Sequence, residues 1–380
     1  MLFPAVLAFL AVKMITLAVN IARFPVLAVT GAPGTGPPSP GPPSPGGQAQ
    51  QVARTVSLLV PVRDEAAALP RFLPAMLRQS GYTELLILDD ESSDGSAAIA
   101  ASLIAGDPRA RIIAGTRAPA GWAGKTWACQ QLASASASST AAAGSILLYC
   151  DADVLLAAGT VTAVLAEMDR QHAEVFSVFP RQQTGSLAER LTTPLIDDVL
   201  LCFLPFPLLS VPVPAAATAN GSLLGFTRQA YEQLGGFAAV RAELVEDVAI
   251  ARAARRRGLR LGLALGGGLA STRMYAGYRE VIRGLGRGLV PALGGSRARL
   301  AAAAAWHLAV YTWPLWRART DRRWLVPLGL GILERLIVAL KADPRSAWQA
   351  ALTPLCPVAF LPVAGQAMRR QQRWKGRSYS

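Results

Sequence analysis

The feature that most constrains this chain is an apolar, strand-like run that ends abruptly in two carboxylates. Residues 145–153 read Ser-Ile-Leu-Leu-Tyr-Cys-Asp-Ala-Asp. The consecutive apolar residues are typical of a strand buried on both faces of a parallel sheet. Hard oxygen ligands at its end, Asp151 and Asp153, suit Mg²⁺ or Mn²⁺, which can in turn hold a diphosphate. An Asp-x-Asp pair alone is more often a strand end with solvated acids, so other motifs must agree.

Two further predicted strands also end in acidic residues. Residues 55–65 run from an apolar strand that contains Pro61 into Arg-Asp-Glu, and residues 84–91 end in Asp-Asp-Glu before an Asp-Gly turn and a helix rich in Ala and Ile. Strands that alternate with helices predict an α/β fold with a mostly parallel sheet, whose ligands bind beyond the carboxyl ends of the strands. We therefore expect Glu65, Asp90 and the Asp151 pair to converge on one edge of the sheet.

A lysine and a second acidic pair lie in turns that open predicted helices. Residues 121–128 read Gly-Trp-Ala-Gly-Lys-Thr-Trp-Ala, which brings Lys125 to a helix start where free N–H groups and a cation can meet a diphosphate. The stretch lacks the Walker spacing, and an ordinary helix start with a solvated lysine explains it equally well. Glu246 and Asp247 begin an amphipathic helix, where acids already complement the helix dipole.

Charge is distributed unevenly along the 380 residues. Residues 1–269 hold 20 Lys and Arg against 20 Asp and Glu, whereas residues 270–380 hold 18 against 4. Long apolar runs interrupt this basic part, which disfavours a nucleic-acid module and favours juxtamembrane cations beside an anionic leaflet. The four Cys form no metal-binding pattern and are expected to be buried and reduced. His172 and His307 lie far apart in sequence, so histidine-based acid–base catalysis is not expected.

The amino-terminal part predicts an anchor and a linker. Residues 1–30 are largely apolar, and their basic residues lie within or after the apolar run, which favours an uncleaved transmembrane anchor over a signal peptide. Residues 31–51 are rich in Pro, Gly and Ser and are expected to be a linker. Residues 52–285 form the predicted catalytic domain. Within it, residues 200–214 carry four prolines, so this apolar stretch is either a surface-embedded, substrate-facing segment or a buried connection.

The carboxyl-terminal part predicts further membrane segments. We expect an interfacial helix and basic loop over residues 286–323, a transmembrane hairpin over 324–366 and a basic cytoplasmic tail over 367–380. This arrangement keeps the basic loop on the same side as the catalytic domain, as the positive-inside rule favours. Glu334 and Arg335, inside the first hairpin helix, are expected to form a structural pair or to face protein. The predicted location is the inner membrane, multi-pass, with the catalytic domain in the cytoplasm.

Taken in order, five motifs resemble family 2 glycosyltransferases over residues 52–285. They are the Val-Pro-Val-Arg-Asp-Glu strand end, the Asp-Asp-Glu-Ser-Ser-Asp-Gly turn, Asp-Ala-Asp, Asn-Gly-Ser with a later Gly-Gly-Phe, and Glu246-Asp247. The Gly-Trp-x-Gly-Lys-x-Trp-Ala stretch, the Arg-Met-Tyr segment at residues 273–275 and the apolar flanks are similar to a membrane-bound branch that glycosylates terpenoid lipids. Hopanoid-associated and carotenoid glycosyltransferases belong to that branch.

The resemblance implies a GT-A (Rossmann-like) fold and a role for each matching residue. Pro61, Glu65, Asp90, Lys125 and Asp151 would contact the nucleotide-diphosphate sugar, Asp153 would hold the Mg²⁺ or Mn²⁺ ion, and Asp247 would be the general base. Trp122, Asn220, Gly221 and Glu246 would lie toward the acceptor or support the site.

The implied activity is an inverting, metal-dependent transfer of one sugar to a hydroxyl or carboxyl of a membrane lipid, with a UDP-sugar as the expected donor. The acceptor would be a terpenoid such as a carotenoid or hopanoid. The Gln-x-x-Arg-Trp motif of polymerising members is not matched, since Arg370-Gln-Gln-Arg373-Trp374 has Arg in place of the first Gln. Two alternatives stay open: a polyprenyl-phosphate sugar synthase, and a non-catalytic membrane scaffold on the same fold. A membrane transporter is disfavoured because few spans are predicted.

Overall fold

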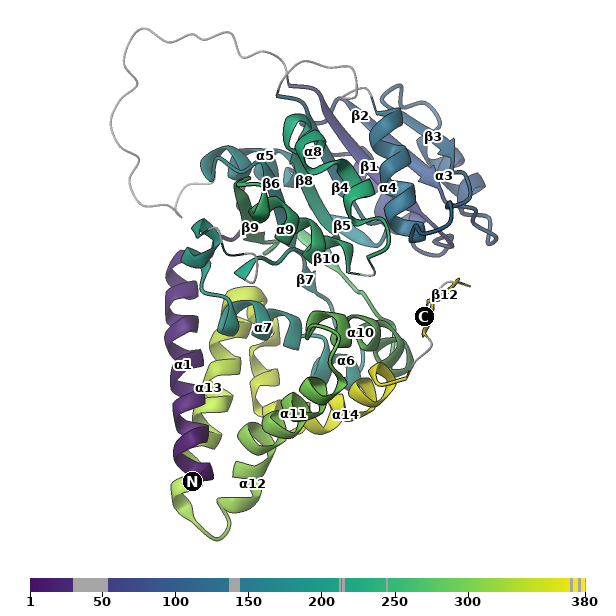
Figure 1. The fold of residues 1–380 in the computed structure, drawn as a ribbon. Coiled ribbons are helices and arrows are strands. Elements are labelled where there is room, and N and C mark those ends of the chain that lie inside the picture. Colours follow the sequence, from purple (N-terminus) through teal and green to yellow (C-terminus); the bar gives the residue numbers. More distant parts are fainter. Residues whose placement is uncertain are drawn as a thin grey trace, which may run out of the picture.

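A computed structural model shows a sheet domain above a tapering bundle of helices (Figure 1). It describes residues 1–29, 54–136, 144–211, 213, 216–243, 245–369, 372–374 and 377–379. The predicted linker, 31–51, lies outside the described residues, as do residues 370, 371, 375, 376 and 380 of the basic tail. The amino terminus lies at the far tip of the helical bundle, and the chain returns from there to the sheet domain.

A seven-stranded mixed sheet forms the centre of the upper domain, with the strand order β3-β2-β1-β4-β8-β6-β9. Only β8 runs antiparallel to its neighbours, so the predicted mostly parallel α/β sheet is confirmed. The seven strands are β1 (Val56–Val62), β2 (Glu84–Asp89), β3 (Ala110–Ala114), β4 (Ile146–Cys150), β6 (Val175–Phe179), β8 (Leu223–Thr227) and β9 (Leu261–Leu265).

Helices cover both faces of this sheet because its central strands are apolar on both sides. The core on one face joins the sheet to α2 (Leu69–Leu77), α3 (Ser96–Ile104) and α5 (Thr160–Arg170). The core on the other face joins it to α4 (Gly124–Ala135), α8 (Arg228–Leu234) and α9 (Glu246–Arg256), with the short η4 (Gly236–Val240) beside them.

A smaller sheet lies below the carboxyl end of β4. Its strands are β5 (Val154–Leu156), β10 (Ala270–Thr272) and β7 (Arg181–Gln182), in the order β5-β10-β7. The register sets Thr272 between Val154 and Gln182. This small sheet therefore brings residues around 153, 273 and 183 next to one another, directly below the predicted metal site.

The remaining elements build the lower, helical part. They are α1 (Leu2–Arg23), α6 (Leu187–Thr192), α7 (Leu195–Phe203), η2 (Phe206–Ser210), α10 (Tyr278–Ala292), α11 (Arg297–His307), η5 (Leu308–Thr312), α12 (Trp313–Arg317), η6 (Arg322–Trp324), α13 (Leu325–Ala342), η7 (Pro344–Leu355) and α14 (Cys356–Ala367). Two short strands, β11 (Gln372–Trp374) and β12 (Arg377–Tyr379), pair near the carboxyl end of the chain.

The amino-terminal helix is part of both the bundle and the sheet domain. Its buried residues recur every three or four positions and face α7 and α13. Beyond the helix, Val26 forms a parallel bridge with Leu265, and the N–H of Leu27 donates to the carbonyl of Leu265 over 2.9 Å. The segment after α1 therefore extends the large sheet at its β9 edge, where it covers an otherwise open strand.

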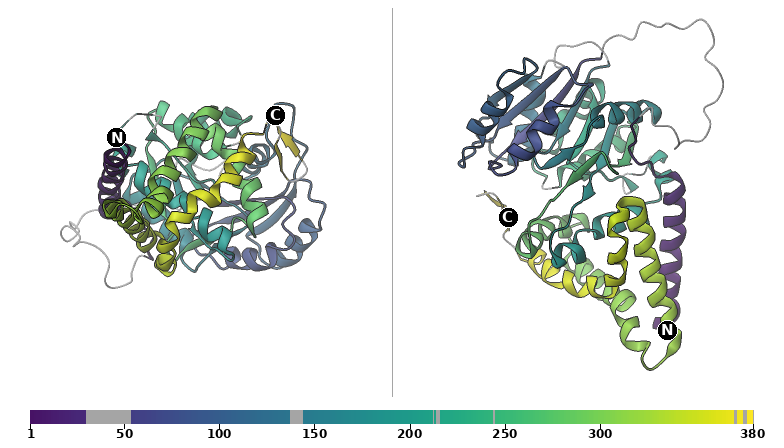
Figure 2. Two further views of the ribbon diagram at one scale, coloured as in Figure 1. Left: turned by 90° about the horizontal axis from the view of Figure 1, so that it is seen from below. Right: turned by 180° about the vertical axis from the view of Figure 1, so that it is seen from behind.

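The lower helices form a leg with α1, the α11–α12 segment and α13 side by side (Figures 1 and 2). The turn between α12 and α13, which contains Arg317 and Arg323, lies at the tip of the leg beside the amino terminus. The predicted interfacial segment thus runs along the leg, and its loop lies at the end farthest from the sheet. How these helices sit in a bilayer stays a prediction.

Among the described residues, two helical segments are long and apolar enough to cross a membrane: Leu2–Arg23 and Pro344–Ala367. Such segments also occur as buried helices and signal sequences, so they only weakly favour membrane association. The helix α13 is not one of them because it carries Glu334, Arg335 and Lys341.

Candidate functional site

The acidic strand ends meet on one edge of the large sheet. In its order, β2, β1 and β4 are neighbours, and the register pairs Val62 with Asp89 and Leu59 with Tyr149. The residues that directly follow these strands therefore lie side by side. This parallel arrangement is the reason that Glu65, Asp90 and Asp151 are expected to converge. Pro61 lies within β1, opposite Leu88 of β2.

Hydrogen bonds join the loop after β1 to the loop after β2. The N–H groups of Asp64 and Glu65 donate to the hydroxyls of Ser92 and Ser96, over 3.0 and 2.8 Å. Asp64 has a positive φ of 51°, a conformation that costs energy unless its surroundings hold it. The loop that carries Glu65 is thus fixed against the loop that follows Asp90.

Asp90 is almost completely buried, at 4% exposure, beneath the same loops. The Arg63 guanidinium donates to its backbone carbonyl over 2.6 Å and lies 3.6 Å from its carboxylate. Burial of a carboxylate is costly unless the carboxylate has a partner. The Arg63 guanidinium is that partner, and it holds Asp90 at the edge of the sheet.

Lys125 forms the positive centre of the site. Its Nζ lies 2.9 Å from Oδ1 of Asp151 and 3.2 Å from Oε1 of Glu246, two residues that are far apart in the sequence. Burial disfavours the ammonium, but the charges of Asp151 and Glu246 outweigh it and raise the pKa of Lys125 well above its ordinary value. The lysine is therefore a cation held by two carboxylates, with 30% of its side chain exposed.

Backbone contacts explain how α4 and α9 meet. The N–H of Ala123 and the hydroxyl of Thr126 both donate to the carbonyl of Arg241, over 2.6 and 2.9 Å. The start of α4 is thus held against the loop that precedes α9. This contact brings Lys125 to Glu246, and no local pattern in the sequence predicts it.

Asp247 is held by a backbone donor on the neighbouring loop. Its Oδ2 accepts from the N–H of Gly221 over 2.8 Å, and its Oδ1 accepts from the N–H of Val248. A Cβ on Gly221 would lie 3.4 Å from Lys125 and Glu246, an ordinary van der Waals distance, so the loop packs directly against both side chains. Burial and the charge of Glu246 raise the pKa of Asp247 to about 6, against the opposing charge of Lys125.

Asp153 lies at the acidic edge of the site. Burial, and then the charges of Asp151 and Glu65, raise the pKa of Asp153 to about 7, while Lys125 opposes the shift. The three carboxylates therefore carry more negative charge than the single lysine balances. Carboxylate oxygens are ligands that suit a hard divalent cation, and a metal ion on Asp153 stays a prediction.

Asn220 and Trp122 are the two remaining predicted site residues. Their contacts shape the site, and none of these contacts indicates a chemical role. The Oδ1 of Asn220 accepts from the N–H of Ser222 over 2.9 Å, which shapes the loop that presents Gly221. Trp122 is half-buried, and its ring packs edge-on against Trp127 with centroids 5.0 Å apart. Contact of either residue with an acceptor stays a prediction.

The sequence did not predict the ion pair between Glu189 and Arg273, which lies beside the site. Glu189 is 1% exposed, accepts from the N–H groups of Gly185 and Gly277, and forms two 3.1 Å bonds with the Arg273 guanidinium. Although burial acts against it, these donors lower the pKa of Glu189 to about 2. The signal in the sequence was Ser186-x-x-Glu189, a capping box whose Ser and Glu do bond each other.

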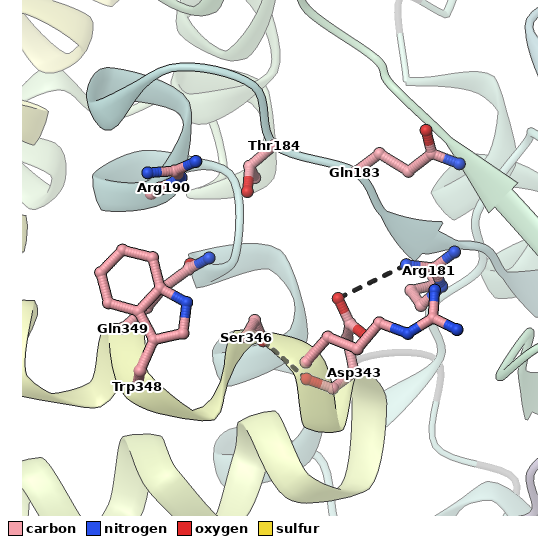
Figure 3. Close-up of a pocket in the computed structure, with 9 residues that line it drawn as sticks. Arg181, Gln183, Thr184, Arg190, Asp343, Ser346, Trp348 and Gln349 are labelled. Carbon is pink, nitrogen blue, oxygen red and sulfur yellow. Dashed lines mark hydrogen bonds and ion pairs between the residues drawn. The ribbon is translucent and has the colours of Figure 1, made fainter.

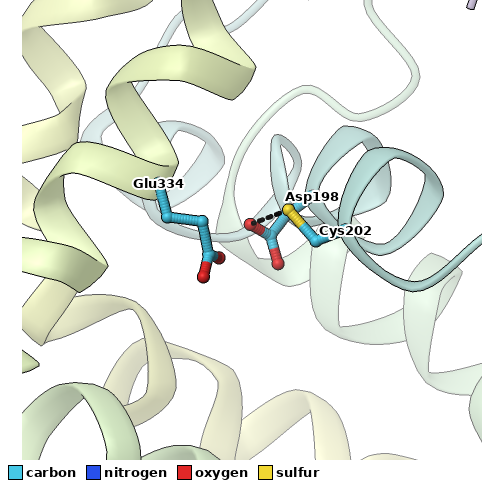
Figure 4. Close-up of side chains that lie close together, drawn as sticks. All are labelled: Asp198, Cys202 and Glu334. Atoms are coloured by element: carbon cyan, nitrogen blue, oxygen red, sulfur yellow. Dashed lines mark hydrogen bonds between the residues drawn. The ribbon is translucent and has the colours of Figure 1, made fainter. Parts of the chain in front are cut away.

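A second cluster of potential metal ligands lies away from this site. Asp198, Cys202 and Glu334 bring a sulfur and carboxylate oxygens within 4.8 Å of one another in the helical part (Figure 4). The ammonium of Lys13 already lies 3.0 Å from Asp198 and 2.6 Å from Glu334. We interpret this cluster as a structural ion pair that joins α1 to α7 and α13.

Glu334 and Arg335 are both buried against protein, which is one of the two expected arrangements. Glu334 pairs with Lys13, whereas the guanidinium of Arg335 donates to the carbonyl of Pro194 over 2.7 Å. Residues that are adjacent on a helix point about 100° apart, so each reaches a different neighbour. All four cysteines are buried and free, as predicted.

The sheet domain is similar in sequence and fold to known glycosyltransferases. Residues 57–217 match the family described as Glycosyl transferase family 2. Over 256 residues the chain is 25% identical to a protein of Staphylococcus haemolyticus named 4,4'-diaponeurosporenoate glycosyltransferase, a match that covers 62% of this chain and 60% of that protein. The match thus spans less than two thirds of that relative.

The fold is similar to a solved mannosyltransferase of Pyrobaculum calidifontis, crystallised with GDP-Man and Mn²⁺. The TM-score is 0.50 at 16% identity, and the likeness covers 97% of this chain and 99% of the other. Together with the five ordered motifs and the sheet order, these matches identify the upper domain. Residues 57–217 therefore match the family 2 glycosyltransferases, and the chain has the GT-A fold.

Proposed function

We propose that this protein is an inverting glycosyltransferase that moves one sugar from a nucleotide-diphosphate sugar to a membrane lipid. The acceptor group would be a hydroxyl or carboxyl of a terpenoid such as a carotenoid or hopanoid. The observation that carries the proposal is the joined cluster of Lys125, Asp151, Glu246 and Asp247 on the acidic edge of the sheet. The name of the staphylococcal relative, a diaponeurosporenoate glycosyltransferase, supports the choice of a terpenoid acceptor.

Each side chain has a task in the proposed reaction. Lys125 would hold the diphosphate of the donor, since its ammonium is a permanent cation at the start of a helix. Asp90, fixed by Arg63, would accept a hydrogen bond from the nucleobase. Asp153 would be the ligand of a divalent cation, Mg²⁺ or Mn²⁺, which when bound neutralises charge on the departing diphosphate.

Asp247 would act as the general base. Its pKa of about 6 leaves it mostly ionised at neutral pH but basic enough to take the proton of an acceptor hydroxyl as that oxygen attacks the anomeric carbon. The Gly221 N–H fixes one oxygen of Asp247 and so orients the carboxylate. Attack from this side, opposite the departing diphosphate, inverts the configuration of the sugar.

The chemical nature of the acceptor group decides how strongly the rate of sugar transfer depends on Asp247. A hydroxyl must lose a proton during attack, whereas a carboxylate or phosphate is already ionised at neutral pH. Transfer to a carboxylate or a polyprenyl phosphate should therefore depend little on Asp247. This difference separates hydroxyl glycosylation from the polyprenyl-phosphate sugar synthase considered above.

Lipid mass spectrometry of cells tests the proposal. Lipids extracted from cells with and without the gene, and with an Asp247→Asn copy, would be compared by mass. We expect a terpenoid lipid heavier by one sugar residue in cells with the wild-type protein and not in cells without the gene. The Asp247→Asn copy should lose this lipid when the acceptor group is a hydroxyl and keep it when the group is a carboxylate. Identical lipid profiles in all three strains would contradict the proposed activity.

A further inference from the structure

A second polar cavity, of about 410 Å³, lies between the small sheet and the lower helices (Figure 3). β7 and the start of α6 form one wall, and the first turns of η7 form the other. None of its lining residues belongs to the carboxylate site described above. We call this cavity the arginine pocket, after Arg181, Arg190 and Arg345.

The arginine pocket carries an excess of positive charge. Arg181 lies 3.5 Å from the carboxylate of Asp343, whereas the Arg190 guanidinium lies over the ring of Trp348 at 5.3 Å. Within the described part of the chain, neither Arg190 nor Arg345 has an acidic partner. Two guanidinium groups are thus left to meet an anion, and their planar forks match a phosphate in particular.

One wall of the pocket also offers an unused hydrogen-bond acceptor. Gln349 is 6% exposed, and its Oε1 is buried without a partner among the described residues. An unpaired buried amide oxygen is costly, so such groups are nearly always satisfied in proteins. A ligand that combines a phosphate with a hydroxyl would meet both the guanidinium groups and Gln349.

The position of the arginine pocket along the helices indicates that such a ligand comes from the surface of a membrane. Lys341 at the end of α13 donates to the carbonyl of Ile21 at the end of α1, over 3.0 Å. The apolar helix α1 therefore ends at the level where the pocket begins, and Trp348, 57% exposed, lies in the first turns of the other candidate span. Tryptophan and arginine side chains gather at this level in membrane proteins.

We propose that the arginine pocket binds the head group of an anionic phospholipid, with its phosphate on Arg190 and Arg345 and a glycerol hydroxyl on Gln349. The lipid would seat the sheet domain on the bilayer and would not be a substrate. This proposal rests on the proposed membrane association. It does not rest on the sugar transfer, because the pocket shares no residue with the catalytic cluster.

Native mass spectrometry of the full chain in detergent micelles tests the pocket. The probes are dioleoyl phosphatidylglycerol and dioleoyl phosphatidylcholine, offered in equal amounts. We expect the wild type to retain phosphatidylglycerol preferentially, and each of Arg190→Gln and Arg345→Gln to weaken that preference about tenfold, as for a lost charge-assisted hydrogen bond. The matched control is Arg257→Gln, an exposed arginine after α9 that should change nothing. Equal retention of both lipids by the wild type would overturn the proposal.

Two further arms separate the alternatives. Gln349→Leu should lower binding of phosphatidylglycerol but not of phosphatidic acid, which lacks the glycerol hydroxyls, and equal losses would contradict the role of Gln349. Displacement of the lipid by sn-glycerol 3-phosphate or inorganic phosphate at equal concentration would assign the pocket to a soluble ligand and overturn the lipid proposal. Retention of phosphatidylglycerol by a protein that transfers no sugar would support the pocket while the proposed activity fails.

Discussion

At the scale of single residues, Asp247 carries the strongest prediction. Asp247→Asn keeps the shape of the side chain and the Gly221 contact but removes the base, so transfer to a hydroxyl acceptor should fall about 10²–10⁴-fold. Binding of the nucleotide sugar, measured by calorimetry, should stay within about twofold, because the change leaves Lys125 in place. Loss of donor binding instead would reassign Asp247 to the donor side.

The pH dependence of the rate follows from the same carboxylate. A pKa raised to about 6 means that Asp247 gains a proton, and so ceases to be a base, as pH falls through about 6. The rate with a hydroxyl acceptor should therefore rise with pH to a plateau above neutrality. Because the charge of Glu246 raises this pKa, Glu246→Gln should move the acidic limb to lower pH. A limb that shifts upward in this variant would contradict the assignment.

Lys125 yields a prediction about the donor. Lys125→Met removes the cation shared by Asp151 and Glu246 and leaves two carboxylates where the diphosphate should lie. The KM for the nucleotide sugar should rise about tenfold or more, as for a lost charge-assisted hydrogen bond. Because Lys125 also lowers the pKa of Asp247, the acidic limb of the rate should move to higher pH. An unchanged KM would return Lys125 to a structural role.

The sequence predicts which residues lie on the acidic edge because strands and their ends are local features. Asp90, Asp151 and Asp153 follow apolar runs, and parallel order then brings such ends together. The bond from Gly221 to Asp247 and the approach of Lys125 to Glu246 were not predictable in this way. The approach of Lys125 to Glu246 depends on a contact of the loop at Arg241 with α4, which no spacing encodes.

At the scale of elements, the least expected feature is the burial of Lys13 in α1. Its ammonium, 1% exposed, contacts Asp198, Glu334 and the hydroxyl of Tyr311, which come from three other helices. The sequence shows Lys13 as an interruption of an apolar run. Its partners lie about 185 and 320 residues away and could not be matched from periodicity alone.

Lys13→Met should destabilise the protein strongly, by about 3–5 kcal/mol, because it leaves two buried carboxylates without a cation. Thermal unfolding in detergent measures the effect. A triple variant that adds Asp198→Asn and Glu334→Gln removes the unpaired charges and should recover most of the loss. A single variant that unfolds at the wild-type temperature would show that the ion pair contributes nothing to stability.

At the scale of the whole molecule, the amino-terminal segment belongs to the fold and is more than the anchor that its composition suggests. It supplies Lys13 to the leg and pairs Val26 and Leu27 with Leu265 at the edge of the sheet. The apolar composition of residues 1–30 predicted an anchor, and a helix covers Leu2–Arg23 of this segment. Composition could not predict a strand contact between Leu27 and Leu265, because sheet pairing depends on the folded arrangement.

Deletion of residues 1–29 should therefore unfold the protein, not merely release it from membranes. The truncated chain would expose the β9 edge and leave Asp198 and Glu334 unpaired, so we expect aggregation or rapid proteolysis. The matched control replaces residues 31–47 by a Gly/Ser sequence of equal length and should stay folded. A soluble, monomeric truncation with a cooperative unfolding transition would contradict this view of α1.

The central claim is that the acidic edge of the sheet transfers a sugar to a lipid with Asp247 as base. The most direct measurement incubates the purified full chain in detergent with Mg²⁺ or Mn²⁺, isotope-labelled UDP- and GDP-sugars and hydroxyl-bearing terpenoid lipids, and follows label into the lipid fraction by mass spectrometry. We predict one labelled sugar per lipid with the wild type and almost none with Asp247→Asn. Equal labelling by both proteins, or no labelling from any donor, would contradict the claim.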